Sequence, residues 1–92
     1  VLARVAVAYE PVWAIGTGKV AGGAEVLEAH ALARRLLTEL AGGAADRIPL
    51  LYGGSVTPAN ASSLLSLDNV NGLLIGGASL EAESFLRIAG AA

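Results

Sequence analysis

The sequence predicts an α/β fold with parallel strands, and two observations predict it. Three short apolar runs, at residues 5–9, 48–52 and 72–75, are each followed by a glycine-containing loop and then by a segment with helical features. Continuous apolar runs of this length are typical of parallel strands that are covered on both faces. Because strands that alternate with helices pair in parallel through right-handed crossovers, we expect three strand-helix units in one sheet.

The first unit consists of a strand at residues 5–9 and a helix at about residues 24–41. Gly42 and Gly43 are expected to end that helix. Apolar side chains recur along it at three- and four-residue spacing, which predicts an inner face made of Val26, Ala29, Ala33, Leu36, Leu37 and Leu40. The charged side chains are expected mostly on the outer side, namely Glu25, Glu28, Arg34, Arg35 and Glu39.

The second and third units have shorter helices with recognisable beginnings. After the strand at residues 48–52, Thr57 is expected to cap a short helix with Pro58 in its first turn, where the missing N–H costs nothing. After the strand at residues 72–75, Ser79 is expected to cap the last helix. Glu81 and Glu83 then lie near the positive end of its dipole.

Composition excludes several classes of protein. The six Lys and Arg residues are dispersed and the net charge is -2, so we expect no nucleic-acid partner. The apolar runs are shorter than the roughly 18 residues of a membrane-spanning helix, so we expect no membrane partner. The absence of cysteine leaves no disulfide framework and no thiolate metal site, which is compatible with a cytoplasmic location. We expect neither a metal nor a cofactor.

Glu10 is the candidate catalytic residue, because it directly follows the first apolar run. In barrels and open α/β sheets, ligands bind at the carboxyl ends of the strands. Under a closed apolar loop a carboxylate loses water and becomes a stronger base, so Glu10 is interpreted as a buried general base. The alternative is that Glu10 ends the strand and pairs with a cation.

The loops after the strands suggest a moving segment and an anion site. Pro11 fixes one backbone angle and Trp13 is a bulky pivot, which together suggest a hinge, although Trp13 could also be packed in the core of an ordinary loop. Glycine-rich turns expose backbone N–H groups that can bind phosphate, as at Gly54 and the pair Gly76 and Gly77. These glycines could instead serve tight turns and close packing alone.

Three segments resemble the triosephosphate isomerase family, in the family's order: YEPVWAIGTGK at residues 9–19, YGGSVTP at residues 52–58 and GLLIGGASL at residues 72–80. The resemblance covers essentially the whole chain. It implies that residues 1–92 are a single incomplete domain, the carboxy-terminal three strand-helix units, units 6 to 8, of a (β/α)8 TIM barrel. A complete barrel has about 250 residues.

The resemblance also implies an activity and the residues that perform it. The activity is an intramolecular aldose-ketose isomerisation, which interconverts D-glyceraldehyde 3-phosphate and dihydroxyacetone phosphate through an enediolate with Glu10 as the base. The backbone amides of Gly16, Ser55, Gly76 and Gly77 would bind the substrate phosphate. Tyr52, with Ser55, would latch a closed lid, and Leu74 would line the pocket. The lid and its two hinges would be Pro11, Val12, Trp13, Ala14, Ile15, Thr17, Gly18, Lys19, Val20 and Ala21, with Gly16 at the tip.

The family's electrophilic lysine and histidine, and the asparagine beside that lysine, belong to earlier strands that this chain does not contain. Lys19 belongs to a hinge, and His30, in the middle of a helix, is interpreted as a packing or surface residue. We therefore expect the isolated chain to be inactive. Its expected partners are a triose phosphate substrate and either the remaining barrel strands or another copy of the chain. The complete enzyme is expected to be a cytoplasmic homodimer of glycolysis and gluconeogenesis.

Two departures from the family pattern are mild. Gly22 and Gly23 stand where a Thr or Ser cap followed by Pro is usual, and Asn71 before Gly72 replaces the commoner Asp.

Two other classes of function stay open: a non-catalytic phosphate-binding or self-assembling barrel fragment, and a different phosphate-binding barrel enzyme.

Overall fold

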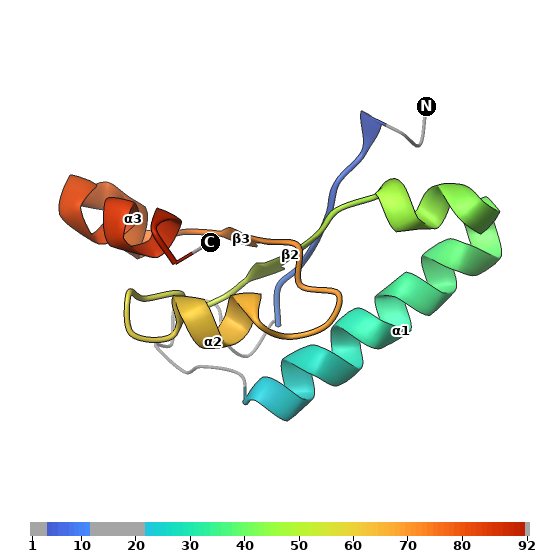
Figure 1. The fold of residues 1–92 in the computed structure, drawn as a ribbon, viewed down its shortest axis with the longest axis horizontal. Coiled ribbons are helices and arrows are strands. Elements are labelled where there is room, and N and C mark those ends of the chain that lie inside the picture. Colours follow the sequence, from blue (N-terminus) through green and yellow to red (C-terminus); the bar gives the residue numbers. More distant parts are fainter. Residues whose placement is uncertain (1–3, 12–21, 92) are drawn as a thin grey trace.

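The computed structural model describes residues 4–11 and 22–91. Figure 1 shows a small parallel sheet with helices packed against it. The elements in chain order are β1 (Val7–Tyr9), α1 (Gly23–Ala41), the 3-10 helix η3 (Gly42–Arg47), β2 (Leu50–Gly53), α2 (Ala61–Leu65), β3 (Gly72–Leu74), the 3-10 helix η4 (Gly77–Leu80) and α3 (Ala82–Ala89).

The sheet has the order β1-β2-β3, and both pairings are parallel. Tyr9 is the register partner of Tyr52, and Gly53 is the partner of Leu74. The predicted parallel α/β arrangement is therefore confirmed. The strand bounds differ from the expected ones: β1 begins at Val7 instead of residue 5, β2 begins at Leu50 instead of residue 48 and runs one residue further to Gly53, and β3 ends at Leu74 instead of residue 75.

The hydrophobic core lies between one face of the sheet and the helices. Because side chains alternate between the faces of a strand, Leu50 and Tyr52 share one face, and both are almost fully buried. A single buried cluster joins this face to all three α-helices through Val26, Tyr52, Val56, Ala61, Leu64, Val70 and Ile88. In Figure 1, α1 and α2 accordingly lie on the same side of the strands.

The opposite face of the sheet carries the alternate residues and is covered much less by the part of the chain that the structure describes. Ala8, Leu51 and Gly72 are register partners across this face, with Ala8 exposed and Leu51 and Gly72 half-buried. At the end of β3, Leu74 is 50% exposed. Of the cover on both faces that the apolar runs predict, residues 4–11 and 22–91 thus supply the helix side only.

Helix α1 begins and ends as predicted, but its inner face differs. Val26 and His30 are fully buried, and they define the inward stripe together with half-buried Leu37. The prediction was wrong for Leu36 and Leu40, which are 46% and 82% exposed. Leu36 lies off that stripe and Leu40 lies in the last turn.

The end of α1 depends on Gly42. Its φ of 60° is in the left-handed region that glycine adopts without a steric cost, and its N–H bonds the Thr38 carbonyl. The helix stop was therefore predicted correctly, although η3 follows it directly.

The turn before α2 shows a reciprocal capping arrangement. The regular helix begins at Ala61, three residues later than the expected first turn at Pro58. Thr57 nevertheless caps the preceding turn, because its Oγ1 accepts a bond of 3.3 Å from the Asn60 N–H while Asn60 Oδ1 accepts one of 2.8 Å from the Thr57 N–H. Thr57 thus caps this turn together with Asn60, but the residue at the N-cap of α2 is Asn60, so the prediction that Thr57 caps the helix was wrong.

The prediction that Ser79 caps the last helix was wrong. Ser79 lies inside η4, where its hydroxyl donates to the Gly76 carbonyl at 2.5 Å and satisfies that turn. Glu81, in an extended conformation, is the residue that precedes α3, and Glu83 occupies its first turn. Glu81 and Glu83 therefore both lie at the start of the helix, as expected.

No helix within residues 4–11 and 22–91 is both long enough and apolar enough to cross a membrane.

Candidate active site

Glu10 lies one residue beyond β1, at the carboxyl edge of the sheet. Alternation along the strand places it on the same face as Ala8, which is the face opposite the helices. A methyl group added at Gly53 would lie 3.4 Å from Glu10 Oε1 and 3.5 Å from Leu74 Cδ2. Glu10, Gly53 and Leu74 therefore form one layer across the ends of the three strands.

At Gly53, which ends β2, a methyl group would make only ordinary contacts with Glu10 and Leu74. The Glu10 carboxylate lies over the end of the neighbouring strand, with Leu74 as an apolar wall on the far side. The predicted base and the predicted pocket residue are thus brought together. Glu10 is exposed, however, so the expectation of a buried carboxylate was wrong for the residues that the structure describes. It projects past the last register pair of β1, where the next residue, Pro11, is the buried one.

The loop after β2 holds Ser55 at the same edge. Ser55 is half-buried, and its carbonyl accepts a bond of 2.9 Å from the Asn60 side-chain amide. Together with the reciprocal bonds between Thr57 and Asn60, this contact fixes the loop from its helix side. Asn60 was not singled out from the sequence, although a polar residue three positions after a Thr cap is a recognisable signal.

Gly76 and Gly77 follow β3 and are both exposed. The Gly76 carbonyl is occupied by the backbone N–H and the hydroxyl of Ser79, with the former at 2.9 Å. The structure therefore brings the Ser55 loop and the Gly76 turn to the edge where Glu10 lies, because all three strands are parallel.

The predicted lid lies outside the described residues, apart from Pro11. This holds for Val12, Trp13, Ala14, Ile15, Gly16, Thr17, Gly18, Lys19, Val20 and Ala21.

Tyr52, the expected latch, is fully buried on the helix side of β2. Its phenol lies directly against Gly54, where an added methyl group would be 2.6 Å from Tyr52 Cζ and still closer to the hydroxyl. The second glycine of the pair is thus required by packing against Tyr52, which is the alternative that the sequence left open for such pairs.

Gly54→Ala is expected to lower the free energy of unfolding by about 1–3 kcal/mol, because the buried Tyr52 ring must shift to admit the methyl group. Gly43→Ala is the matched control, since none of the described residues has an atom within 4 Å of a methyl group there. Urea unfolding of both variants measures the difference. Equal stabilities for the two variants would contradict the packing role of Gly54.

His30 was interpreted from the sequence as a packing or surface residue, and the structure places it in the core, fully buried. It lies beneath the two tyrosines that precede the site. Its ring is edge-on to Tyr9, with centroids 5.8 Å apart, and tilted towards Tyr52 at 6.4 Å. Position in the middle of a helix gave no signal for this contact.

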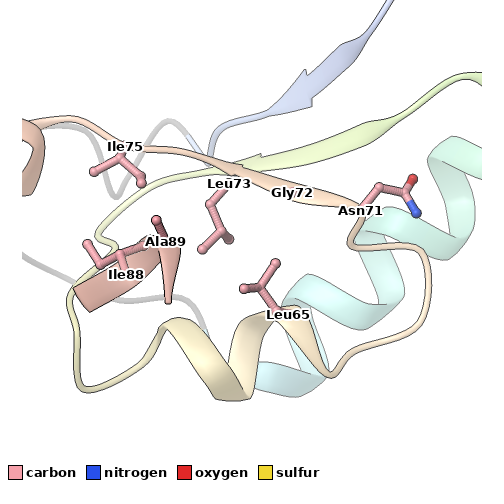
Figure 2. Close-up of a pocket in the computed structure, with 7 residues that line it drawn as sticks. All are labelled: Leu65, Asn71, Gly72, Leu73, Ile75, Ile88 and Ala89. Atoms are coloured by element: carbon pink, nitrogen blue, oxygen red, sulfur yellow. The ribbon is translucent and has the colours of Figure 1, made fainter. Parts of the chain in front are cut away.

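The structure also contains an apolar cavity of about 180 Å³, lined by Leu65, Asn71, Gly72, Leu73, Ile75, Ile88 and Ala89. In Figure 2 the side chains of Leu65, Leu73 and Ile88 point towards one another between α2, β3 and α3. Because Leu73 and Ile75 pack on the helix-side core, this cavity is separate from Glu10. Within the described ranges no group of three or more His, Asp or Glu side chains could hold a metal ion.

The parallel strand-helix units, with a carboxylate and two glycine-containing loops at one edge, define part of an α/β-barrel protein. Comparison with known proteins supports this class. The crystal structure of triosephosphate isomerase from Bartonella henselae is similar with a TM-score of 0.89 and 46% identity, over 99% of this chain and 36% of that chain.

The sequence model of the triosephosphate isomerase family matches residues 1–92, and the chain belongs to this family. A triosephosphate isomerase of Oleidesulfovibrio alaskensis is 65% identical over 85 residues, which are 92% of this chain and 34% of the relative. One from Nitratidesulfovibrio vulgaris is 71% identical over 82 residues, which are 89% of this chain and 33% of the relative. The chain thus spans about a third of the length of the curated relatives that it matches.

Proposed function

We propose that this chain supplies the general base and the phosphate-binding loops of a triosephosphate isomerase, as strand-helix units 6 to 8 of its barrel. The observation that carries the proposal is the layer of Glu10, Gly53 and Leu74 at the carboxyl edge of the sheet. It combines a carboxylate, room beside it and an apolar wall, on the face of the sheet against which none of the described helices packs.

The proposed reaction moves one proton between neighbouring carbons. The Glu10 carboxylate removes a proton from the carbon next to the substrate carbonyl, and the electron pair of that C–H bond forms the double bond of an enediolate. The protonated Glu10 then returns the proton to the adjacent carbon, so the base is regenerated and no other reactant is consumed. A single carboxylate that reaches both carbons can serve both transfers at carbon, while the proton of the substrate hydroxyl passes to the neighbouring oxygen through a group that the remaining barrel strands would supply.

The phosphate of the substrate is proposed to bind the backbone amides of Ser55, Gly76 and Gly77, together with Gly16. Barrel enzymes commonly bind phosphate at the loops after strands seven and eight, which correspond here to the loops after β2 and β3. Support comes from the parallel register, which directs both loops to the edge that carries Glu10.

The remaining parts of the site are proposed to come from the other barrel strands, including a lysine and a histidine that polarise the carbonyl. Residues 1–92 would then be one incomplete domain, inactive alone, within a cytoplasmic enzyme that is a homodimer when full length. The lid of residues 12–21 would close over the substrate with Tyr52 as its latch.

A chimera tests this proposal. In it the chain replaces the segment of the Oleidesulfovibrio alaskensis relative to which it aligns at 65% identity. We expect the chimera to interconvert the two triose phosphates, measured in a coupled assay, and the 92-residue chain alone to show no turnover. A folded chimera without activity would overturn the proposal.

A second candidate function is a non-catalytic fragment that binds phosphate or associates with itself. The exposed side chains of Leu32, Leu36 and Leu40, at four-residue spacing along α1, favour it. An inactive but folded chimera, with an isolated chain that forms oligomers or binds inorganic phosphate, would support this candidate instead.

A further inference from the structure

His30 is a fully buried polar side chain for which the proposed reaction has no use. Its Nδ1 lies 2.8 Å from the carbonyl oxygen of Asn69, the residue with a φ of 66° in the loop before β3. Since a carbonyl oxygen can only accept a hydrogen bond, Nδ1 must carry the proton. The ring is therefore tied to that loop through its Nδ1–H group.

The other ring nitrogen has a different environment. Nε2 is buried and has no hydrogen-bond partner among residues 4–11 and 22–91. Leaving a polar atom in this state costs about 1–3 kcal/mol, so a ring without this nitrogen would pack here at a lower cost. His30 can therefore stabilise this part of the structure in two ways, through its bond to Asn69 and through the packing of its ring.

The ring contacts lead directly to the site. His30 packs edge-on against Tyr9, with an interplanar angle of 90°, and at 45° against Tyr52. These tyrosines are register partners, and each immediately precedes a member of the site layer: Tyr9 precedes Glu10, and Tyr52 precedes Gly53. The imidazole thus lies under both strands, one residue before the carboxylate and the glycine beside it.

The geometry points to His30 as a positioning residue for the base: its ring, held by Asn69, supports Tyr9 and Tyr52 and thereby fixes Glu10 over Gly53. This role rests on the proposed function of Glu10 and does not include contact with the substrate. A displacement of about 1 Å at a reacting group can cost up to 10²-fold in rate, so a support one residue away can matter for turnover.

Two variants in the chimera separate the ring from the hydrogen bond. His30→Asn keeps an N–H at the position of Nδ1 but removes the ring. We expect it to lower kcat about tenfold, with KM for the triose phosphate within about twofold of the parent value. His30→Phe keeps a ring but leaves the Asn69 carbonyl without its donor. It is expected to keep kcat within about threefold of the parent value. If the Asn variant does not fold, His30→Gln, which also lacks a ring, takes its place with the same expected result.

A structural readout accompanies the kinetics. In NMR spectra, the nuclear Overhauser effect between the Glu10 side chain and the Gly53 α-protons is expected in the parent chimera and in His30→Phe, and is expected to weaken in His30→Asn. The proton of the parent ring is expected on Nδ1.

The outcomes distinguish the two proposals. An inactive parent chimera overturns the proposed isomerase function, whereas the Overhauser effects still decide whether His30 positions Glu10. Unchanged Overhauser effects in all variants, a proton on Nε2, or a kcat in His30→Asn equal to that of an active parent overturn the role of His30. A loss of kcat in His30→Phe as large as in His30→Asn would also overturn it, because the ring would then not be the supporting element.

Discussion

Glu10→Gln is expected to lower kcat of the chimera by about 10²- to 10⁴-fold, which is the usual contribution of a positioned general base. The amide has nearly the shape of the carboxylate and can occupy the same position over Gly53, but it cannot accept a proton from carbon. Because the amide still fills the space beside Leu74, KM is expected to change by less than an order of magnitude. Steady-state kinetics in both reaction directions measures the two parameters.

Glu10→Asp tests geometry with the charge kept. The shorter side chain draws the carboxylate back from the end of β2 by about one methylene length, and the expected loss in kcat is about 10²-fold. Glu28→Gln is the matched control, since Glu28 is exposed on α1 and a loss of the same charge there should leave kcat unchanged. A Gln variant at position 10 with the activity of this control would show that Glu10 is not the base.

The position of Glu10 could be predicted from the sequence because it depends on one local pattern. An apolar run forms a strand, the residue after the run lies at the carboxyl edge, and parallel pairing directs all such edges to one side. The Ser55 and Gly76 loops follow from the same pattern. Nothing beyond strand assignment was needed for these placements.

Contacts across the fold could not be predicted in this way. The fit of Glu10 against Gly53 depends on the register between β1 and β2, which short apolar runs do not specify. His30 follows the helical period of Val26, but periodicity does not say that two tyrosines lie above that face. Ser79 was wrongly placed because its hydroxyl bonded a carbonyl within its own turn, a local competition that serine often enters.

Arg34 is the clearest failure of the helical pattern, because it was assigned to the outer side of α1 and is half-buried instead. Its Nη1 donates to the carbonyls of Ala45 and Ile48, the latter at 2.7 Å. Its Nη2 donates to Asn71 Oδ1 at 2.7 Å, and its Nε lies 3.3 Å from Asn69 Oδ1. One guanidinium thus joins the segment before β2 to the loop before β3. The presence of a charged residue in the helical pattern does not predict these contacts.

Arg34→Met is therefore expected to lower the free energy of unfolding by about 2–5 kcal/mol, because methionine keeps much of the stem and removes every donor. Ala45 and Ile48 are 0% and 1% exposed, so water cannot easily replace the lost bonds at their carbonyls. Urea unfolding of the chimera, analysed at a common m-value, measures the change.

Arg35→Met supplies the matched control for that measurement, since Arg35 is the next residue on the same helix and is exposed. We expect its effect to stay within about 0.5 kcal/mol, as for most surface substitutions. The difference between the two variants then isolates the contacts of one guanidinium from the loss of one positive charge. If both variants unfolded at the same urea concentration, the Arg34 bonds would contribute nothing to stability, and the loops before β2 and β3 would be held by their other bonds, among them those of His30 with Asn69 and of the Leu50 N–H with Asn71 Oδ1.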